Sequence, residues 1–295
     1  MTDTMSATSV EARRGDLRML LGLERLAPGR FVGSRYQLNI NGSIYGGQIF
    51  AQALNAAFET VEGRVAHSVQ ASFLRPAVDG VPIEYEVANM LDGASYSMRY
   101  VQASQNGKPL LALTASFKTS EDAALDHPDH MSDPWPDPEA LRNLDQQLGG
   151  DASSTGSRTL PRFPDVEVRP CMPDRYLLRV GGPPQHDAWV RAVGKLSDEA
   201  ADHQTAIAYL SDFGMTFPVM TPYVEQVRKT PLRYATLNHS LWFHGHSSAL
   251  DWIAFRTIGS WAGDGRCLHH GRMYDRSGNL VASVAQEALI RRISR

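Results

Sequence analysis

The segment Ala208–Phe213 closes a predicted helix and places the carboxylate of Asp212 near the last helical turn. The C-terminal end of a helix carries partial negative charge, which disfavours an ionised carboxylate and makes Asp212 a better proton acceptor. Taken alone, this segment is more typical of a solvated Asp at a helix end. Two later segments, around Thr236 and Gln286, change that balance.

Gln286 lies in a predicted apolar strand, between Val284 and Leu289. Such neighbours indicate burial, and a buried amide must find hydrogen-bond partners. Thr236 offers a hydroxyl, although a Thr in a strand is ordinary in itself because its β propensity is high. Together, the carboxylate of Asp212, the hydroxyl and the amide could hold and activate one water molecule by general-base catalysis.

Gly46 and Gly47 open a second predicted helix, Gly47–Thr60. Free backbone N–H groups at a helix N-terminus could stabilise the negative oxygen that develops when a carbonyl is attacked. The same two glycines could instead do no more than permit a tight turn before the helix. The sequence leaves both interpretations open.

Other chemistries lack their motifs. No Gly-x-Ser-x-Gly segment marks a serine nucleophile. The histidines fall at no spacing typical of a metal site, so no metal and no cofactor are expected. Cys171 and Cys267 are too few for a disulfide framework and lie in no nucleophile motif.

The composition is that of an ordinary globular protein: 295 residues, 42% hydrophobic and 21% charged. A net charge of -3 gives no basic field to attract nucleic acid. No apolar run is long enough for a membrane span, and the first residues lack the apolar centre of a signal peptide. We therefore expect a cytoplasmic protein with no nucleic-acid partner.

The predicted elements are of the α+β kind, with a helix followed by antiparallel strands in each half. In the first half, strong hairpin signals at Asp92-Gly93 and Asn106-Gly107 separate three of four strands, predicted at 65–74, 81–91, 95–105 and 110–118. In the second half, Ser197 is the expected N-cap of a helix that runs to Phe213. A loop is expected at 216–231, with strands at 163–169, 188–195, 234–244, 251–260, 266–275 and 280–291.

The two halves repeat. His67-Ser68 matches His239-Ser240, and Asp92-Gly93 matches Asp264-Gly265, both at an offset of about 172 residues. The alternative is a chance agreement of common dipeptides. The repeat predicts two units, 14–118 and 162–295, joined by a Pro-, Gly- and Ser-rich linker, 119–161. In this alignment Ala115 matches Gln286, so one catalytic site per chain is expected.

At this point the sequence resembles the acyl-CoA thioesterase II (TesB-like) family, whose fold is a double hotdog. The resemblance runs from about Leu17 to Arg291 and rests on the order and spacing of several segments. They are Tyr45-Gly46-Gly47-Gln48, His67-Ser68, Phe73-Leu74-Arg75-Pro76, Asn106-Gly107-Lys108-Pro109, Thr114-Ala115-Ser116-Phe117, Ser211-Asp212, His239-Ser240-Leu241-Trp242-Phe243-His244 and Gln286-Glu287.

The resemblance implies hydrolysis of fatty acyl-CoA to a free fatty acid and CoA. It also implies that Asp212, Thr236 and Gln286 hold the attacking water, and that the chain forms a homo-oligomer, a dimer or tetramer. Asn238 departs from the family pattern, where an Asp is expected. It lies near Thr236 in the sequence and could alter the local charge.

Two other functions are consistent with this fold. A hotdog hydratase or dehydratase would act on the same thioesters, usually with an Asp–His pair near one helix. His203 lies nine residues before Asp212, nearly half a turn off its face, so that pair is poorly placed. A non-catalytic acyl-CoA-binding protein would be expected to lack a member of the trio, and none is missing.

Overall fold

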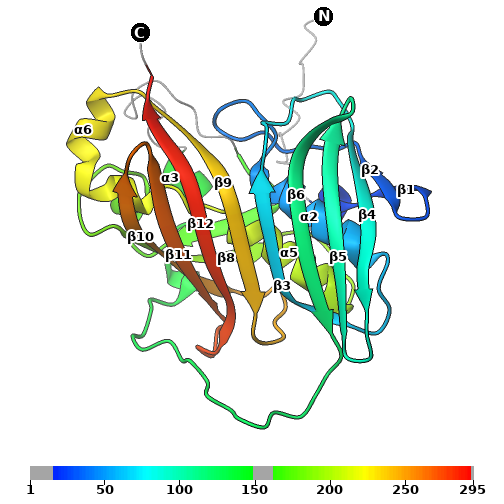
Figure 1. Cartoon of the computed structure of the whole chain (residues 1–295). Coiled ribbons are helices and arrows are strands. Elements are labelled where there is room, and N and C mark those ends of the chain that lie inside the picture. The colour runs from blue at the N-terminus through cyan, green and yellow to red at the C-terminus, as the bar shows by residue number, and fades with distance from the viewer. Residues whose placement is uncertain (1–15, 149–161, 294–295) are drawn as a thin grey trace, which may run out of the picture.

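The computed structural model describes residues 16–148 and 162–293. Their strands form one twelve-stranded antiparallel sheet in the order β1-β2-β4-β5-β6-β3-β9-β12-β11-β10-β8-β7. Six strands come from each half of the chain, and the sheet bends around two helices, α2 and α5, on one of its faces (Figure 1). The arrangement is the double hotdog that the resemblance implied.

The N-terminal unit is built around α2, which carries eleven buried residues and is therefore covered on nearly all sides. Its elements are α1 (Leu17–Leu21), β1 (Glu24–Ala27), β2 (Arg30–Gly33), α2 (Gly46–Phe58), β3 (Val65–Phe73), β4 (Ile83–Asp92), β5 (Tyr96–Gln105) and β6 (Lys108–Lys118). The four long strands fall within two residues of their predicted bounds, because the hairpin turns fix where each strand ends.

The C-terminal unit repeats this plan around α5. Its elements are β7 (Val166–Pro170), α4 (Pro173–Tyr176), β8 (Gln185–Ala192), α5 (Ala200–Ser211), η2 (Pro218–Tyr223), α6 (Val224–Lys229), β9 (Leu232–Phe243), β10 (Ile253–Gly263), β11 (Arg266–Tyr274) and β12 (Leu280–Arg292). The β10–β11 turn places Asp264 and Gly265 at φ 48° and 69°, the left-handed geometry that an Asp-Gly hairpin favours.

Two features join the units. The edge strands β3 and β9 pair antiparallel, with Ser68 opposite Trp242 and Ser72 opposite Asn238. Behind them, α2 and α5 pack against each other, and one cluster of buried apolar side chains spans both units. Each unit thereby covers the sheet edge that the other would leave open.

Three local expectations were wrong. Ser197 is not the N-cap of α5, which begins at Ala200; its hydroxyl instead lies 2.7 Å from the carboxylate of Asp202. The predicted loop at 216–231 contains η2 and α6, since a proline in the first position of a helix, as Pro218 is in η2, is compatible with helical geometry. The alignment of the two halves is also shifted. Ala115 and Gln286 occupy matching positions, and their partners in the sheet are Val69 and His239. Val69, and not His67, therefore matches His239.

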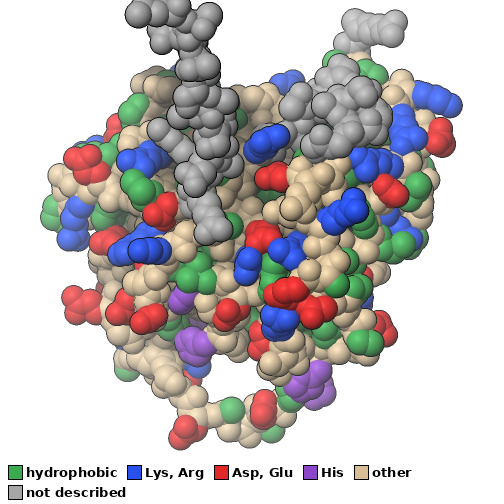
Figure 2. Space-filling model, turned by 180° about the vertical axis from the view of Figure 1, so that it is seen from behind, with side chains coloured by type: hydrophobic (Ala, Val, Ile, Leu, Met, Phe, Trp, Pro, Cys, Tyr) green, Lys and Arg blue, Asp and Glu red, His purple; other side chains and the backbone are tan. Residues whose placement is uncertain are grey.

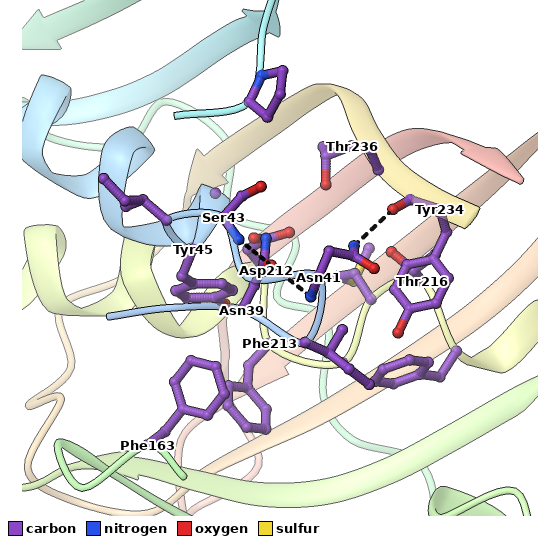
Figure 3. Close-up of a pocket in the computed structure, with 18 of the residues that line it drawn as sticks. Asn39, Asn41, Ser43, Tyr45, Phe163, Asp212, Phe213, Thr216, Tyr234 and Thr236 are labelled. Carbon is purple, nitrogen blue, oxygen red and sulfur yellow. Dashed lines mark hydrogen bonds between the residues drawn. The ribbon is translucent and has the colours of Figure 1, made fainter. Parts of the chain in front are cut away.

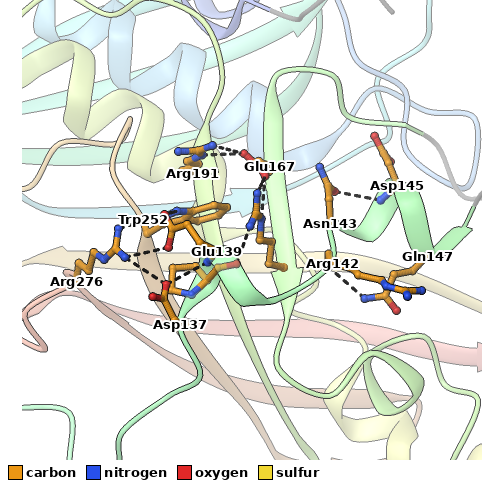
Figure 4. A network of polar contacts seen from close by, with 12 residues as sticks. Asp137, Glu139, Arg142, Asn143, Asp145, Gln147, Glu167, Arg191, Trp252 and Arg276 are labelled. Atoms are coloured by element: carbon orange, nitrogen blue, oxygen red, sulfur yellow. Dashed lines mark hydrogen bonds and ion pairs between the residues drawn. The ribbon is translucent and has the colours of Figure 1, made fainter.

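The described part of the linker packs against the C-terminal unit. A short 3-10 helix, η1 (Pro138–Ala140), presents Glu139 to the indole N–H of Trp252 at 2.9 Å and to Arg276 at 2.9 Å (Figure 4). A second short helix, α3 (Leu144–Leu148), follows. Residues 14–15, 149–161 and 294–295 lie outside the described residues, so the domain boundaries remain predictions.

Cutting the chain before this docked segment should leave the two units associated, because the β3–β9 pairing and the α2–α5 contact do not depend on the connection. A suitable position for the cut is Leu125, whose side chain is 93% exposed. We expect a specific protease site inserted after Leu125 to be cleaved without change in the eluted mass on size-exclusion chromatography. Separation of the two fragments in native buffer would contradict this architecture.

Candidate active site

The structure brings together the three side chains singled out as the catalytic trio. Asp212 is the C-cap residue of α5, Thr236 lies on β9 and Gln286 lies on the adjacent strand β12. The amide nitrogen of Gln286 donates to the Thr236 hydroxyl at 3.3 Å and also hydrogen-bonds the carboxylate of Asp212. Gln286 is only 1% exposed and is therefore the buried centre of the group.

A β-bulge directs Thr236 toward the other two residues. Gln286 pairs with His239 and Ala288 pairs with Thr236, so β9 has one extra residue between these pairs. Residues three apart in a regular strand point to opposite faces, but the bulge puts Thr236 and His239 on the same face as Gln286. The extra residue in the ladder is Leu237.

Asp212 is held by the N-terminus of the helix from the other unit. The backbone N–H of Gly47 hydrogen-bonds its carboxylate. A Cβ at Gly46 would lie 3.3 Å from the Asp212 Oδ2, and one at Gly47 would lie 2.7 Å from the Tyr45 ring. The two glycines therefore allow this close approach across the interface between the units.

Burial is the main reason why the pKa of Asp212 rises from 3.8 to about 7. Protein surrounds most of its side chain, although part of it lines a cavity. The hydrogen bonds from Gly47 and Gln286 lower the pKa and oppose the burial effect. A carboxyl group with a pKa near neutrality can both take up and release a proton at physiological pH.

No role in the site was predicted for His239 and Ser211, yet both support Gln286. His239 Nδ1 lies 2.6 Å from Gln286 Oε1, and its Nε2 lies 2.8 Å from the Ser211 hydroxyl. Burial lowers the His239 pKa to about 4, so the ring is neutral. Because a carboxamide oxygen only accepts, Nδ1 carries the proton, and this bond turns the Gln286 amide nitrogen toward Thr236 and Asp212.

Two more residues define the surroundings. Thr216 adds a second hydroxyl, which accepts from the Gln286 amide at 3.4 Å. Asn238 lies opposite Glu287 in the sheet and donates to its carboxylate at 3.1 Å. The side chain of Asn238 is therefore engaged with Glu287, and no hydrogen bond between it and the trio is found among the described residues.

Asp212 and Thr236 line a cavity of about 1010 Å³ at the junction of the two units, and Gln286 lies behind them. Figure 3 shows Asp212, Thr236 and Thr216 around this cavity, with the loop Asn39–Ser43 of the N-terminal unit running beside them. Aromatic side chains such as Phe163 line the same space. A cavity with a polar centre and apolar walls suits a substrate that is mostly hydrocarbon near its reacting group.

His203 is not part of this site. His203 Nδ1 accepts from the backbone N–H of Ala249 at 3.2 Å, and so serves a loop of its own unit. Within residues 16–148 and 162–293, no group of three or more His, Cys, Asp or Glu side chains could hold a metal ion. Over the same ranges, no helix is long and apolar enough to cross a membrane.

Comparison with known proteins gives a consistent result. Residues 36–118 match the family model of the acyl-CoA thioesterase N-terminal domain, and residues 122–290 match that of the C-terminal domain. The chain is 32% identical to acyl-coenzyme A thioesterase 8 of Mus musculus, over 94% of this chain and 91% of the mouse protein.

Solved structures agree. An acyl-CoA thioesterase II, TesB2, from Mycobacterium marinum superposes with a TM-score of 0.76 at 29% identity, covering 94% of this chain and 99% of the other. The tesB protein of Mycobacterium avium subs paratuberculosis gives 0.73 at 31% identity, with 92% and 97% covered. The chain therefore belongs to the acyl-CoA thioesterase II family and is a thioester hydrolase.

Replacing Asp212 should stabilise the protein in a pH-dependent way. Its folded pKa is raised above the usual value, so its contribution to stability is present at low pH and is lost as pH rises toward about 7. We expect Asp212→Asn to raise Tm by a few degrees at pH 8 and by less at pH 5, measured by scanning calorimetry.

The matched control is Asp198→Asn, at an exposed position just before the same helix. It removes one carboxylate without removing a buried charge, so its effect on Tm should be small at both pH values. A shift for Asp212→Asn that is equal at pH 5 and pH 8 would show that the carboxylate is not buried as described.

Proposed function

We propose that this chain hydrolyses fatty acyl-CoA to a free fatty acid and CoA, using a water molecule held by Asp212, Thr236 and Gln286. The observation that carries the proposal is the buried carboxylate of Asp212, whose pKa of about 7 suits a general base. It adjoins a buried amide and a large cavity. The family of the chain supplies the substrate class.

In the proposed reaction, the water oxygen attacks the thioester carbonyl carbon while Asp212 takes one of its protons. The carboxamide of Gln286 and the hydroxyl of Thr236 orient the water. The tetrahedral intermediate then collapses, the carbon–sulfur bond breaks, and the proton on Asp212 passes to the departing sulfur. The products are the fatty acid and the CoA thiol, and Asp212 returns to its ionised state.

The developing oxyanion needs a donor that is not already engaged. The N–H of Gly47 is bonded to Asp212, so it is a poor candidate. Gly46 is the first residue of α2, where the N–H has no intrahelical acceptor, and it lines the cavity. We assign the oxyanion contact to the Gly46 N–H, assisted by the positive end of the helix dipole.

The two competing functions predict different products. A hotdog hydratase would convert an enoyl-CoA without releasing the thiol, and a binding protein would release nothing. Incubation with palmitoyl-CoA and a thiol reagent distinguishes them, because only hydrolysis produces free CoA. The expected homo-oligomer and the cytoplasmic location remain predictions; light scattering measures the former.

Single substitutions in the trio should lower kcat far more than they change KM. We expect Asp212→Asn to reduce kcat by roughly 10²-fold or more, because the side chain keeps its shape and loses its basicity. Gln286→Ala should act similarly, and Thr236→Ala less severely, since a second water could replace the hydroxyl. The double variant Asp212→Asn/Gln286→Ala should be strongly non-additive, because both residues act on one water.

The pH profile provides the control. For the wild type, kcat/KM should rise with pH and level off above about 7, as Asp212 loses its proton. Asp198→Asn should keep this profile and the wild-type rate. A folded Asp212→Asn protein with near-normal kcat would refute the mechanism while leaving the family assignment intact.

A further inference from the structure

The cavity has a second, basic end. Four arginines line it, Arg75, Arg233, Arg291 and Arg292, against two acidic residues, Asp145 and Asp212. The four arginines are all exposed. In the described part of the chain, none of the four forms an ion pair with a carboxylate. The cavity therefore runs from a buried carboxyl group to an exposed, uncompensated positive charge.

Two of these arginines are directly opposite each other. Arg233 on β9 pairs with Arg291 on β12 in the antiparallel ladder. Side chains at paired positions share one face with Cβ atoms about 5 Å apart, and like charges placed there destabilise the sheet. On the neighbouring strand, by contrast, Arg266 is neutralised by Glu287 at 2.8 Å. Charge balance therefore does not explain the Arg233–Arg291 pair.

Several arginines elsewhere in the described part of the chain are balanced by carboxylates. On the face seen in Figure 2, basic and acidic side chains are interspersed. Arg256 on β10, for example, lies 3.0 Å from the carboxylate of Asp187. Arg233 and Arg291, by contrast, face each other at the edge of the reaction cavity and form no ion pair with a carboxylate among the described residues.

The course of β9 connects the two ends of the cavity. Its pairing with β3 stops at Asn238, so the first part of β9 runs past the end of β3. There the side chain of Asn41 donates to the carbonyl oxygen of Tyr234 at 3.1 Å. Both faces of this part of β9 line the cavity, Thr236 on the inner face and Arg233 on the outer face. The cavity therefore continues around the strand edge from the trio to the arginines.

We propose that Arg233 and Arg291 bind the phosphate groups of the CoA nucleotide. This inference rests on the proposed function, because it takes acyl-CoA as the substrate whose thioester reaches Asp212. The hydrocarbon and the thioester occupy the inner part of the cavity. The pantetheine arm, which joins the thioester to the nucleotide, passes the edge of β9. The nucleotide then remains outside, where guanidinium groups contact phosphate oxygens by charge-assisted hydrogen bonds.

Arg75 and Arg292 flank this pair with different geometry. Arg75 donates to the carbonyl oxygen of Pro109 at 2.8 Å, which holds its side chain in place just after β3. Arg292 pairs with Leu232 and so points to the opposite face of the sheet from Arg291. The direct phosphate contact is therefore assigned to Arg233 and Arg291, with the other two contributing to the surrounding positive potential.

The test is the double variant Arg233→Gln/Arg291→Gln, with binding of free CoA measured by isothermal titration calorimetry. We expect Kd to rise about tenfold or more at low salt, and the difference from wild type to shrink as salt is added. Dephospho-CoA and pantetheine serve as further probes. Loss of affinity for CoA alone assigns the 3′-phosphate, loss for CoA and dephospho-CoA assigns the pyrophosphate, and pantetheine binding should not discriminate the proteins.

The charge-matched control is Arg18→Gln/Arg30→Gln, which removes two exposed arginines from the N-terminal unit, outside the cavity. It should keep the wild-type Kd for CoA. The double variant at 233 and 291 should also be no less stable than wild type, since it relieves like-charge repulsion. An unchanged Kd for CoA, or an equal loss for pantetheine, would overturn the inference.

Calorimetry separates this inference from the proposed function. A protein that binds CoA through the two arginines yet releases no thiol from palmitoyl-CoA would refute hydrolysis and retain the binding site. A protein that hydrolyses palmitoyl-CoA with the same KM in the wild type and the double variant would retain the function and refute the site.

Discussion

The hydrogen bond from the N-terminus of α2 to the carboxylate of Asp212 is the contact on which the site depends. It links the N-terminus of α2 in one unit to the C-cap residue of α5 in the other, so it exists only when the two units are side by side. The backbone N–H of Gly47 can reach the carboxylate because neither Gly46 nor Gly47 has a Cβ, which at Gly46 would lie 3.3 Å from Asp212 Oδ2. The β3–β9 pairing fixes that separation.

Fusion of two units in one chain allows them to become unequal. The C-terminal unit carries His239 and Gln286 as a buried pair, whereas the matching pair in the N-terminal unit is Val69 and Ala115, both fully buried and apolar. A buried polar pair needs every hydrogen bond satisfied, so keeping only one such pair leaves the other half free to build an ordinary core. The N-terminal unit contributes its helix terminus instead.

The sequence predicts the parts of this structure that local signals determine. Asn106-Gly107 and Asp264-Gly265 fix two hairpins, and the repeat of such signals predicts the two units. The start of α5 was misplaced because the Ser197 hydroxyl caps no N–H inside the helix. It donates to the Asp202 carboxylate and accepts from the backbone N–H of Glu199, which is itself the N-cap residue.

The site itself was predictable in residue identity and not in geometry. The family resemblance pointed to Asp212, Thr236 and Gln286, but strict alternation along β9 would have placed Thr236 on the opposite face from His239. The extra residue that brings Thr236 to the same face as His239 is Leu237. It is neither a glycine nor a typical turn residue, so nothing in the sequence marks the bulge. Partners brought together by such tertiary geometry, including Ser211 and His239, leave no spacing to recognise.

The polar groups around Asp212 explain why its pKa lies near neutrality and not far above it. Burial alone raises the pKa, and a second carboxylate at position 286 would raise it further by repulsion. The amide of Gln286 instead donates to the ionised form and lowers the pKa, as does the Gly47 N–H. His239 fixes the direction of that amide while remaining neutral, so it adds no positive charge that would make Asp212 a weaker base. The pKa of Asp212 is therefore set by burial, which raises it, opposed by two neutral donors, which lower it.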